Sequence, residues 1–170
     1  MDYYSQIGQD RWVVETLKFK NNGTWLDIGS GLPIHINNTY FFEKNLNWSG
    51  VSIDLSDEET ALWKETDRNL DWLVKTNALT VDYKILLKER GMPKVIDYLS
   101  MDLEPPLVTL EALFRVPFDE YQFRCITYET DAYRGFNTVT PSRDYLKSLG
   151  YTLVVSGIQD DFWVKQDLIN

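Results

Sequence analysis

Short apolar runs alternate with segments of helical periodicity over most of this chain, and this alternation limits the folds that the chain can adopt. The runs predict strands at 24–28, 51–54, 70–76, 95–101 and 123–128, and the intervening periodicity predicts helices at 7–19, 38–46, 57–66, 81–91, 108–114 and 141–149. Because a strand that follows its neighbour through a helix lies parallel to it, we expect an α/β fold. The expected fold has a mostly parallel central sheet with helices on both faces.

The end of the chain departs from this alternation. Residues 151–155 and 161–165 predict two more strands with no helix between them, and such a pair is antiparallel. We therefore expect an antiparallel C-terminal strand pair at one edge of the sheet. The 170 residues contain no linker and no repeat, so the sequence predicts a single domain over 1–170.

Charge and composition narrow the partners that we expect. The formal net charge is -9, and an acidic surface repels phosphate backbones, so we expect no nucleic-acid partner. The single cysteine, Cys125, excludes an intrachain disulfide and fits a reducing cytoplasm. No apolar run approaches the ~20 residues that span a bilayer, so we expect no membrane partner. The sequence does not indicate an oligomeric state.

The segment after the first predicted strand has a ligand-binding pattern. It is Asp27-Ile28-Gly29-Ser30-Gly31, an acidic residue followed by Gly-x-Gly. This pattern is typical of loops that hold an adenosine-containing cofactor, because glycine lets the backbone approach the ligand. The dinucleotide fingerprint needs a third glycine where this chain has Ile34, which argues against NAD.

Polar residues also follow the later predicted strands, at the sheet edge where α/β proteins bind ligands. Asp54 is placed to accept both hydroxyls of a ribose, Asn77 can bond the edge of adenine, and Ala78 leaves room for the flat ring. Asp27 or Asp102 could face a positively charged part of the ligand. Glu104, Glu129 and Asp131 follow the fourth and fifth strands. Caps and turns also use such residues, and for Asn77, Glu104, Glu129 and Asp131 the sequence favours neither interpretation.

Five segments in this order are similar to one known family. They are Ser-Gln-Ile-Gly-Gln-Asp at 5–10, Trp-Leu-Asp-Ile-Gly-Ser-Gly at 25–31, Asn-Thr-Tyr-Phe-Phe-Glu-Lys at 38–44, Trp-Ser-Gly-Val-Ser-Ile-Asp at 48–54 and Asp-Tyr-Leu-Ser-Met-Asp-Leu-Glu at 97–104. Together they resemble the FkbM-type family of S-adenosylmethionine (SAM)-dependent methyltransferases. The resemblance implies a Rossmann-like methyltransferase fold with SAM as cofactor. This chain departs from the family pattern after Asp-x-Glu, where Pro105 and Pro106 stand in place of the usual glycine.

The resemblance also implies roles for particular residues. It implies cofactor contacts at Asp27, Gly29, Gly31 and Asp54, with Asn77 and Asp102 beside them, and it makes Asn38 and Thr39 candidates. The N-terminal segment of the family often covers the site, which points to Gln6 and Gln9.

Methyl transfer to oxygen also needs a group that removes the acceptor proton. His35 is the one histidine, and we expect it to be an exposed loop residue. We therefore expect the catalytic groups to be Asp102, Glu104 and Glu129. Converging carboxylates can bind Mg²⁺, but no spacing here is a specific metal motif, so we predict no metal.

The expected reaction is SAM-dependent O-methylation of a small molecule or glycan. An acceptor pocket could include aromatic rings of the late strands, although we expect at least half of them in the core: Tyr128, Tyr133, Phe136 and Trp163. The alternative is a non-catalytic module that keeps the cofactor fold for binding. A nicotinamide oxidoreductase is a third and weaker hypothesis.

Overall fold

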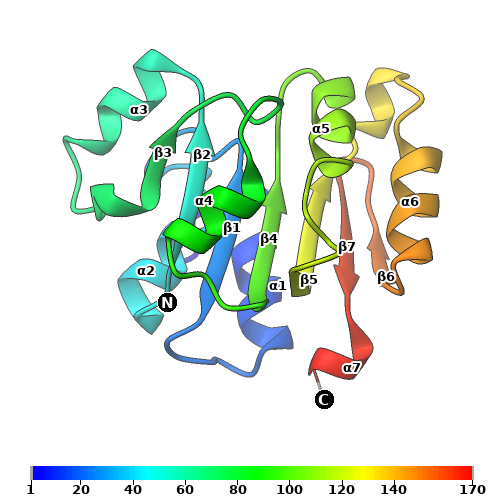
Figure 1. Cartoon of the computed structure of the whole chain (residues 1–170), viewed down its shortest axis with the longest axis horizontal. Coiled ribbons are helices and arrows are strands. Elements are labelled where there is room, and N and C mark those ends of the chain that lie inside the picture. The colour runs from blue at the N-terminus through cyan, green and yellow to red at the C-terminus, as the bar shows by residue number, and fades with distance from the viewer. Residues whose placement is uncertain (1, 170) are drawn as a thin grey trace.

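The computed structural model describes residues 2–169, which form one seven-stranded sheet covered by helices on both faces (Figure 1). The strand order is β3-β2-β1-β4-β5-β7-β6. The strands are β1 (Thr24–Ile28), β2 (Ser49–Asp54), β3 (Leu73–Lys75), β4 (Val95–Met101), β5 (Gln122–Glu129), β6 (Thr152–Ser156) and β7 (Asp160–Val164). Strands β1 to β5 are parallel, whereas β7 is antiparallel to both β5 and β6. The predicted fold class and the predicted C-terminal strand pair are confirmed.

The helices divide between the two faces of the sheet because strand side chains alternate in direction. On one face Leu26 and Ile126 pack in a core cluster with residues of α4, α5 and α6, and on the other Trp25 and Cys125 pack with α1 and α2. Figure 1 shows α4 and α5 in front of the sheet and α1 behind it. The helices are α1 (Gln9–Thr16), α2 (Tyr40–Leu46), α3 (Asp57–Trp63), α4 (Tyr83–Glu89), α5 (Pro106–Leu113), α6 (Val139–Ser148) and α7 (Gln166–Ile169), with 3-10 turns η1 (Leu70–Trp72) and η2 (Ala132–Arg134).

Two elements differ from their predicted bounds for reasons in the local backbone. The predicted strand at 70–76 opens instead with η1, because the side chain of Asn69 accepts a hydrogen bond from the Asp71 amide and caps the turn. The predicted helix at 7–19 begins only after Gly8, which adopts a φ of 88°, and Ser5 is not its N-cap. The Ser5 hydroxyl donates to Asp10 instead.

The two consecutive prolines begin α5 rather than precede it. Pro105 is the N-cap and Pro106 is the first helical residue, a position where the missing amide hydrogen costs nothing. Ser56 is the N-cap of α3, because its hydroxyl accepts a hydrogen bond from the Glu59 amide at 3.1 Å. The short helix α7 was not predicted. None of the helices within residues 2–169 has the length and apolar character needed to cross a bilayer.

The strand order places a reversal of chain direction at the centre of the sheet. From β1 the chain continues to β2 and β3 on one side, and it then crosses to β4 and β5 on the other. The connections that leave the carboxyl ends of β1 and β4 therefore go opposite ways and leave a crevice between them.

Candidate cofactor-binding site

A cavity of about 570 Å³ occupies this crevice, a volume typical of sites for small ligands. We call it the strand-end cavity. Segments that follow all five parallel strands contribute to its lining. Nine of the ten predicted site residues line it: Gly29, Gly31, Asn38, Asp54, Asn77, Ala78, Asp102, Glu104 and Glu129. The fold thus brings together residues that are as much as 100 positions apart in the sequence (129 − 29).

The two glycines of the first loop have different roles. Gly29 has a φ of 86°, and a Cβ placed on it would lie 1.8 Å from the backbone oxygen of Asp102. The loop therefore packs directly on the end of β4, which only glycine permits. Gly31 also has a positive φ, of 58°, but a Cβ there would meet only Glu59 Oε1, at 3.9 Å. Gly31 thus leaves room on the cavity side of the loop.

Asp54, at the end of β2, ties the glycine loop to the start of α3. One carboxylate oxygen accepts a hydrogen bond from the Gly31 amide and the other accepts one from the Ser56 amide, both at 2.8 Å. Each carboxylate oxygen has a second lone pair, so Asp54 can still accept hydrogen bonds from a ligand. The cap interpretation and the ligand interpretation of this residue are therefore compatible.

Of the candidates that the resemblance added, Gln6 lines the strand-end cavity, whereas Gln9 and Thr39 do not. Asp27 does not line the cavity either. It lies within β1 rather than after it, and the two-residue period of the strand turns its side chain towards α2. The side chain is buried and accepts a hydrogen bond of 3.3 Å from the Thr39 hydroxyl. Burial raises the pKa of Asp27 to about 7. Its position supports the wall of the cavity from behind.

Arg68 fixes the rest of the loop after β1, a role that no sequence pattern predicts. The side chain is 4% exposed and donates to the Pro33 carbonyl at 2.7 Å and to Asn37 Oδ1 at 3.0 Å. It also pairs with Glu43 on α2 at 2.6 Å, and its guanidinium lies 4.1 Å from the centre of the Trp63 ring. Burial lowers the pKa of Arg68, although Glu43 opposes this shift. Residues 33–39 are thereby held against α2 and α3.

Asn38 presents an unsatisfied acceptor at the wall of the strand-end cavity. Its amide nitrogen donates to the Ser100 hydroxyl at 3.0 Å, whereas its buried Oδ1 has no hydrogen-bond partner. A buried acceptor without a partner costs about 1–3 kcal/mol. A ligand that donates a hydrogen bond at this point would remove the cost. This observation fits a bound ammonium or amide group.

The charge of the lining is uniformly negative. The strand-end cavity is lined by six carboxylates, and none of the described residues that line it is Lys, Arg or His. The carboxylates belong to Asp54, Glu59, Asp102, Glu104, Glu129 and Asp131. Burial, together with the neighbouring carboxylates, raises the pKa of Glu59 and of Asp102 and raises that of Glu129 to about 10. With a pKa of about 10, the Glu129 carboxyl holds a proton at neutral pH, and its buried Oε2 has no hydrogen-bond partner.

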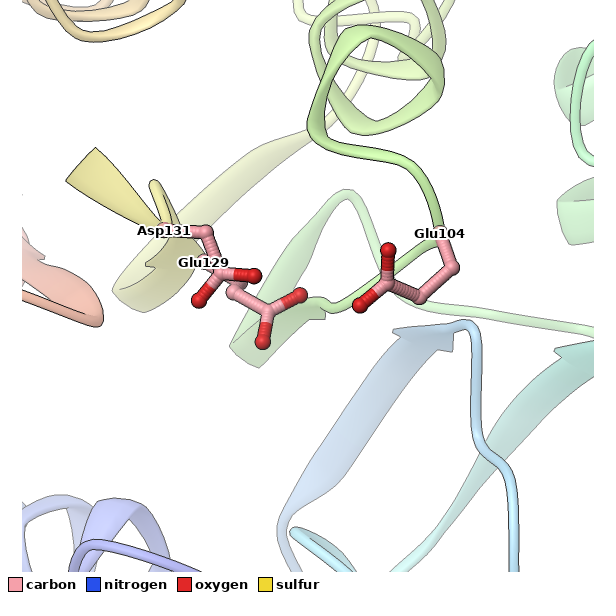
Figure 2. Close-up of side chains that lie close together, drawn as sticks. All are labelled: Glu104, Glu129 and Asp131. Atoms are coloured by element: carbon pink, nitrogen blue, oxygen red, sulfur yellow. The ribbon is translucent and has the colours of Figure 1, made fainter. Parts of the chain in front are cut away.

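Four of these residues lie together after β4 and β5, and we call them the carboxylate edge: Asp102, Glu104, Glu129 and Asp131. Figure 2 shows Glu104 facing Glu129 and Asp131 across the gap between the two segments. Glu104, Glu129 and Asp131 each have an oxygen within 4.8 Å of the others. Arg134 bridges two of them, with its Nη1 2.6 Å from Glu104 and 3.0 Å from Asp131. A guanidinium of the protein therefore balances part of the charge at the rim.

The predicted aromatic lining is reduced to one ring. Tyr133 is 64% exposed and lines the cavity, whereas Tyr128 and Trp163 are fully buried in the core. Phe136 does not line the cavity and packs instead beneath the guanidinium of Arg134. His35 is exposed and lies outside the lining, so it is not placed to take the acceptor proton.

No protein-family model matches the chain, and no curated protein matches its sequence. Solved structures match over nearly its whole length. A proposed rRNA methylase from Clostridium thermocellum superposes with a TM-score of 0.60 at 15% identity, covering 96% of each chain. A proposed O-methyltransferase from Klebsiella pneumoniae gives 0.59 at 15% identity, covering 96% of this chain and 81% of that one. A TehB-like SAM-dependent methyltransferase from Corynebacterium glutamicum gives 0.55 at 14% identity, with coverages of 96% and 89%.

The chain has the Rossmann-like methyltransferase fold. Identities this low establish the fold alone. The resemblance to the FkbM-type family therefore stays a prediction.

Proposed function

We propose that the chain is a SAM-dependent methyltransferase and that the strand-end cavity holds the cofactor. The observation that carries this proposal is a cavity at the reversal of the sheet lined by six carboxylates. SAM carries a sulfonium and an ammonium group, and both cations would be stabilised there. A dinucleotide would instead bring a pyrophosphate next to carboxylates. Moreover, α2 begins nine residues after Gly31 (40 − 31), so its N-terminus does not follow the glycine loop directly as in a dinucleotide site.

Each part of the lining has a matching part of the cofactor. We assign the ribose hydroxyls to Asp54 and the adenine ring to Asn77 and Ala78. The ammonium group is assigned to Asn38, which lines the cavity as Gly31 does. Gly29 and Asp27 act indirectly, because they set the position of the loop.

We propose O-methylation of a small molecule or glycan as the reaction. Bound SAM supplies a methyl group on a positively charged sulfur. The acceptor hydroxyl would lose its proton to a carboxylate of the protein. Asp102 and Glu104 lie at the cavity edge for this task, and Glu129 lies beside them. Because the pKa of Glu129 is about 10, its carboxyl holds a proton at neutral pH and acts there as a hydrogen-bond donor.

The acceptor class follows from charge rather than from the fold. The fold also occurs in a proposed rRNA methylase, so it leaves the acceptor open. The net charge of -9 and the acidic lining favour an acceptor without phosphate groups. The resemblance of residues 97–104 and the preceding segments to the FkbM-type family supports the same assignment.

Isothermal titration tests the cofactor assignment. We expect wild type to bind SAM and S-adenosylhomocysteine, and Asp54→Asn to weaken both by at least about tenfold, or ~1.4 kcal/mol. Asp82→Asn is the matched control, because Asp82 also accepts a hydrogen bond from a backbone amide, at 3.0 Å, but lies outside the strand-end cavity. No binding by wild type, or equal weakening in both variants, would contradict the proposal.

A non-catalytic binding module is the second candidate. One feature favours it, namely that the Glu129 carboxyl is already protonated at neutral pH and so cannot take a proton from an acceptor. Incubation with methyl-labelled SAM and a panel of hydroxyl acceptors separates the two candidates. Transfer of label to any acceptor excludes the binding module.

A further inference from the structure

A second cavity, of about 530 Å³, adjoins the strand-end cavity, and we call it the side groove. The two cavities share Tyr133 and Gln159 in their linings. The remaining residues of the side groove come from the N-terminal segment and from the β6–β7 hairpin: Ile7, Val155, Gly157, Ile158, Asp160 and Phe162. A molecule in the side groove would therefore lie next to whatever occupies the strand-end cavity.

The surface of the side groove is mostly apolar and uncovered. Ile158 is 71% exposed and Tyr133 is 64% exposed, and Ile7 and Val155 are also exposed. Phe162 is nearly buried, and its ring lies 4.8 Å from the ring of Trp12. Several large apolar side chains gathered around one hollow are typical of a binding surface.

The backbone fixes this groove to the carboxylate edge. The amides of Thr130 and Asp131 donate to the Gln159 carbonyl at 2.6 and 2.9 Å, and the Ala132 amide donates to the Ile158 carbonyl at 3.0 Å. These bonds continue the pairing of β5 with β7 beyond the strand ends. The distance between the apolar wall and the carboxylates is therefore set by the sheet.

Asp160 places a carboxylate in the side groove. It pairs with Glu129 across the β5–β7 ladder and is 6% exposed. Gln9 of α1 donates to Asp160 Oδ2 at 3.0 Å. Burial raises the pKa of Asp160 to about 7, and Asp102, Asp131 and Asp161 add to the shift. A hydroxyl group in the groove could thus donate to this carboxylate.

We propose that the side groove binds the methyl acceptor, and that the acceptor has a ring or similar apolar group, a hydroxyl that donates to Asp160, and no anionic group. This inference rests on the proposed methyltransferase function. The exclusion of anions follows from the acidic residues at the groove, since Asp160 lines it, Asp131 lies near Asp160, and none of its described lining residues is Lys, Arg or His. The nearby guanidinium of Arg134 is engaged by Glu104 and Asp131.

Three matched phenols test the charge requirement. They are 4-ethylphenol, tyramine and 3-(4-hydroxyphenyl)propanoate, which present the same ring with a neutral, a cationic and an anionic side chain. Saturation-transfer NMR in the presence of S-adenosylhomocysteine should detect binding of the first two. The anionic phenol should bind at least about tenfold more weakly than 4-ethylphenol. Equal binding of the anion, or no binding of the neutral and cationic phenols, would overturn the inference.

A pair of variants tests the location. Ile158→Asp should weaken the binding of 4-ethylphenol by about tenfold. Ile85→Asp is the control, because Ile85 is comparably exposed on α4 and lines neither cavity. Unchanged phenol binding by Ile158→Asp would also overturn the inference. Each protein is also titrated with S-adenosylhomocysteine. If the wild-type protein does not bind S-adenosylhomocysteine, this result counts against the proposed function rather than against the side groove.

Discussion

Two segments form opposite sides of the strand-end cavity and are stabilised in opposite ways. Residues 33–39, after β1, are held by the buried Arg68, which bonds to a carbonyl, an amide oxygen and a carboxylate, and by Asn37, whose side chain bonds to backbone groups of the loop. The carboxylate edge, after β4 and β5, instead gathers like charges, with one partner in Arg134 at the rim.

The difference shows how the fold divides two requirements of a cofactor site. The first side is rigid, and it holds Asn38 at a fixed place with an acceptor left unsatisfied. On the second side, ionised carboxylates are unfavourable, and the pKa values of Asp102 and Glu129 are raised for this reason. A cationic ligand would lower both pKa values. Substitutions on the first side should therefore change stability most, and those on the second should change its pH dependence.

The largest effect is expected from Arg68→Leu. Removing one partner of a buried charged network typically costs about 3–5 kcal/mol, because the remaining groups lose their hydrogen bonds without regaining water. Urea denaturation measures the change. The control is Arg11→Leu, whose ion pair with Glu15 lies on the surface and should contribute nothing measurable. A cost for Arg68→Leu below about 1 kcal/mol would show that residues 33–39 are held by other contacts.

A smaller effect is expected from Gly29→Ala. The added Cβ meets the Asp102 backbone, and the positive φ adds strain, so we expect a loss of about 3 kcal/mol. Gly91 has a φ of 65°, but nothing lies within 4 Å of an added Cβ. Gly91→Ala should therefore lose only about 1 kcal/mol of stability. Thermal unfolding measures the loss of stability in both variants. Gly91→Ala reports backbone strain alone, and Gly29→Ala reports strain together with the contact to Asp102. Equal losses would mean that the loop can move away from β4.

Glu129→Gln should change the pH dependence of stability. The pKa of Glu129 is raised from 4.5 to about 10, so the folded protein binds this proton more tightly than the unfolded chain does. Its contribution is complete below about pH 4.5 and is lost as the pH rises towards 10. Glutamine does not titrate, so the fall in Tm between about pH 5 and 9 should be shallower in the variant.

The acidic groups around Glu129 are Asp102, Glu104, Asp131 and Asp160, and they remain in the variant. Glu111→Gln, on the exposed surface of α5, is the control and should keep the wild-type slope. Identical slopes in all three proteins would show that Glu129 does not hold a proton at neutral pH.

Local sequence patterns predicted most of the fold and much of the candidate site. The rule that ligands bind at the carboxyl ends of parallel strands identified Gly31, Asp54, Asn77 and Asp102 from their positions alone. Asp27 does not line the cavity, because it lies within β1, where the two-residue period turns its side chain towards α2.

The missed residues depend on contacts that the sequence pattern does not contain. Arg68 acts through partners about 30 positions away, in a polar segment that predicts only a loop. Asp160 is the first residue of β7, which is antiparallel to β5. The first residue of β7, and not the last, therefore lies beside Glu129 at the carboxyl end of the parallel strands. The rule used for the parallel strands must therefore be reversed for β7. That reversal depends on knowing that β7 pairs with β5.

The most direct test is a crystal structure of the wild-type protein with S-adenosylhomocysteine at saturating concentration. We expect the ligand in the strand-end cavity, with its ribose at Asp54, its amino group within hydrogen-bond distance of Asn38 Oδ1 and its sulfur facing the carboxylate edge. A strand-end cavity without ligand under these conditions, or ligand bound elsewhere on the protein, would contradict the assignment of this cavity to the cofactor.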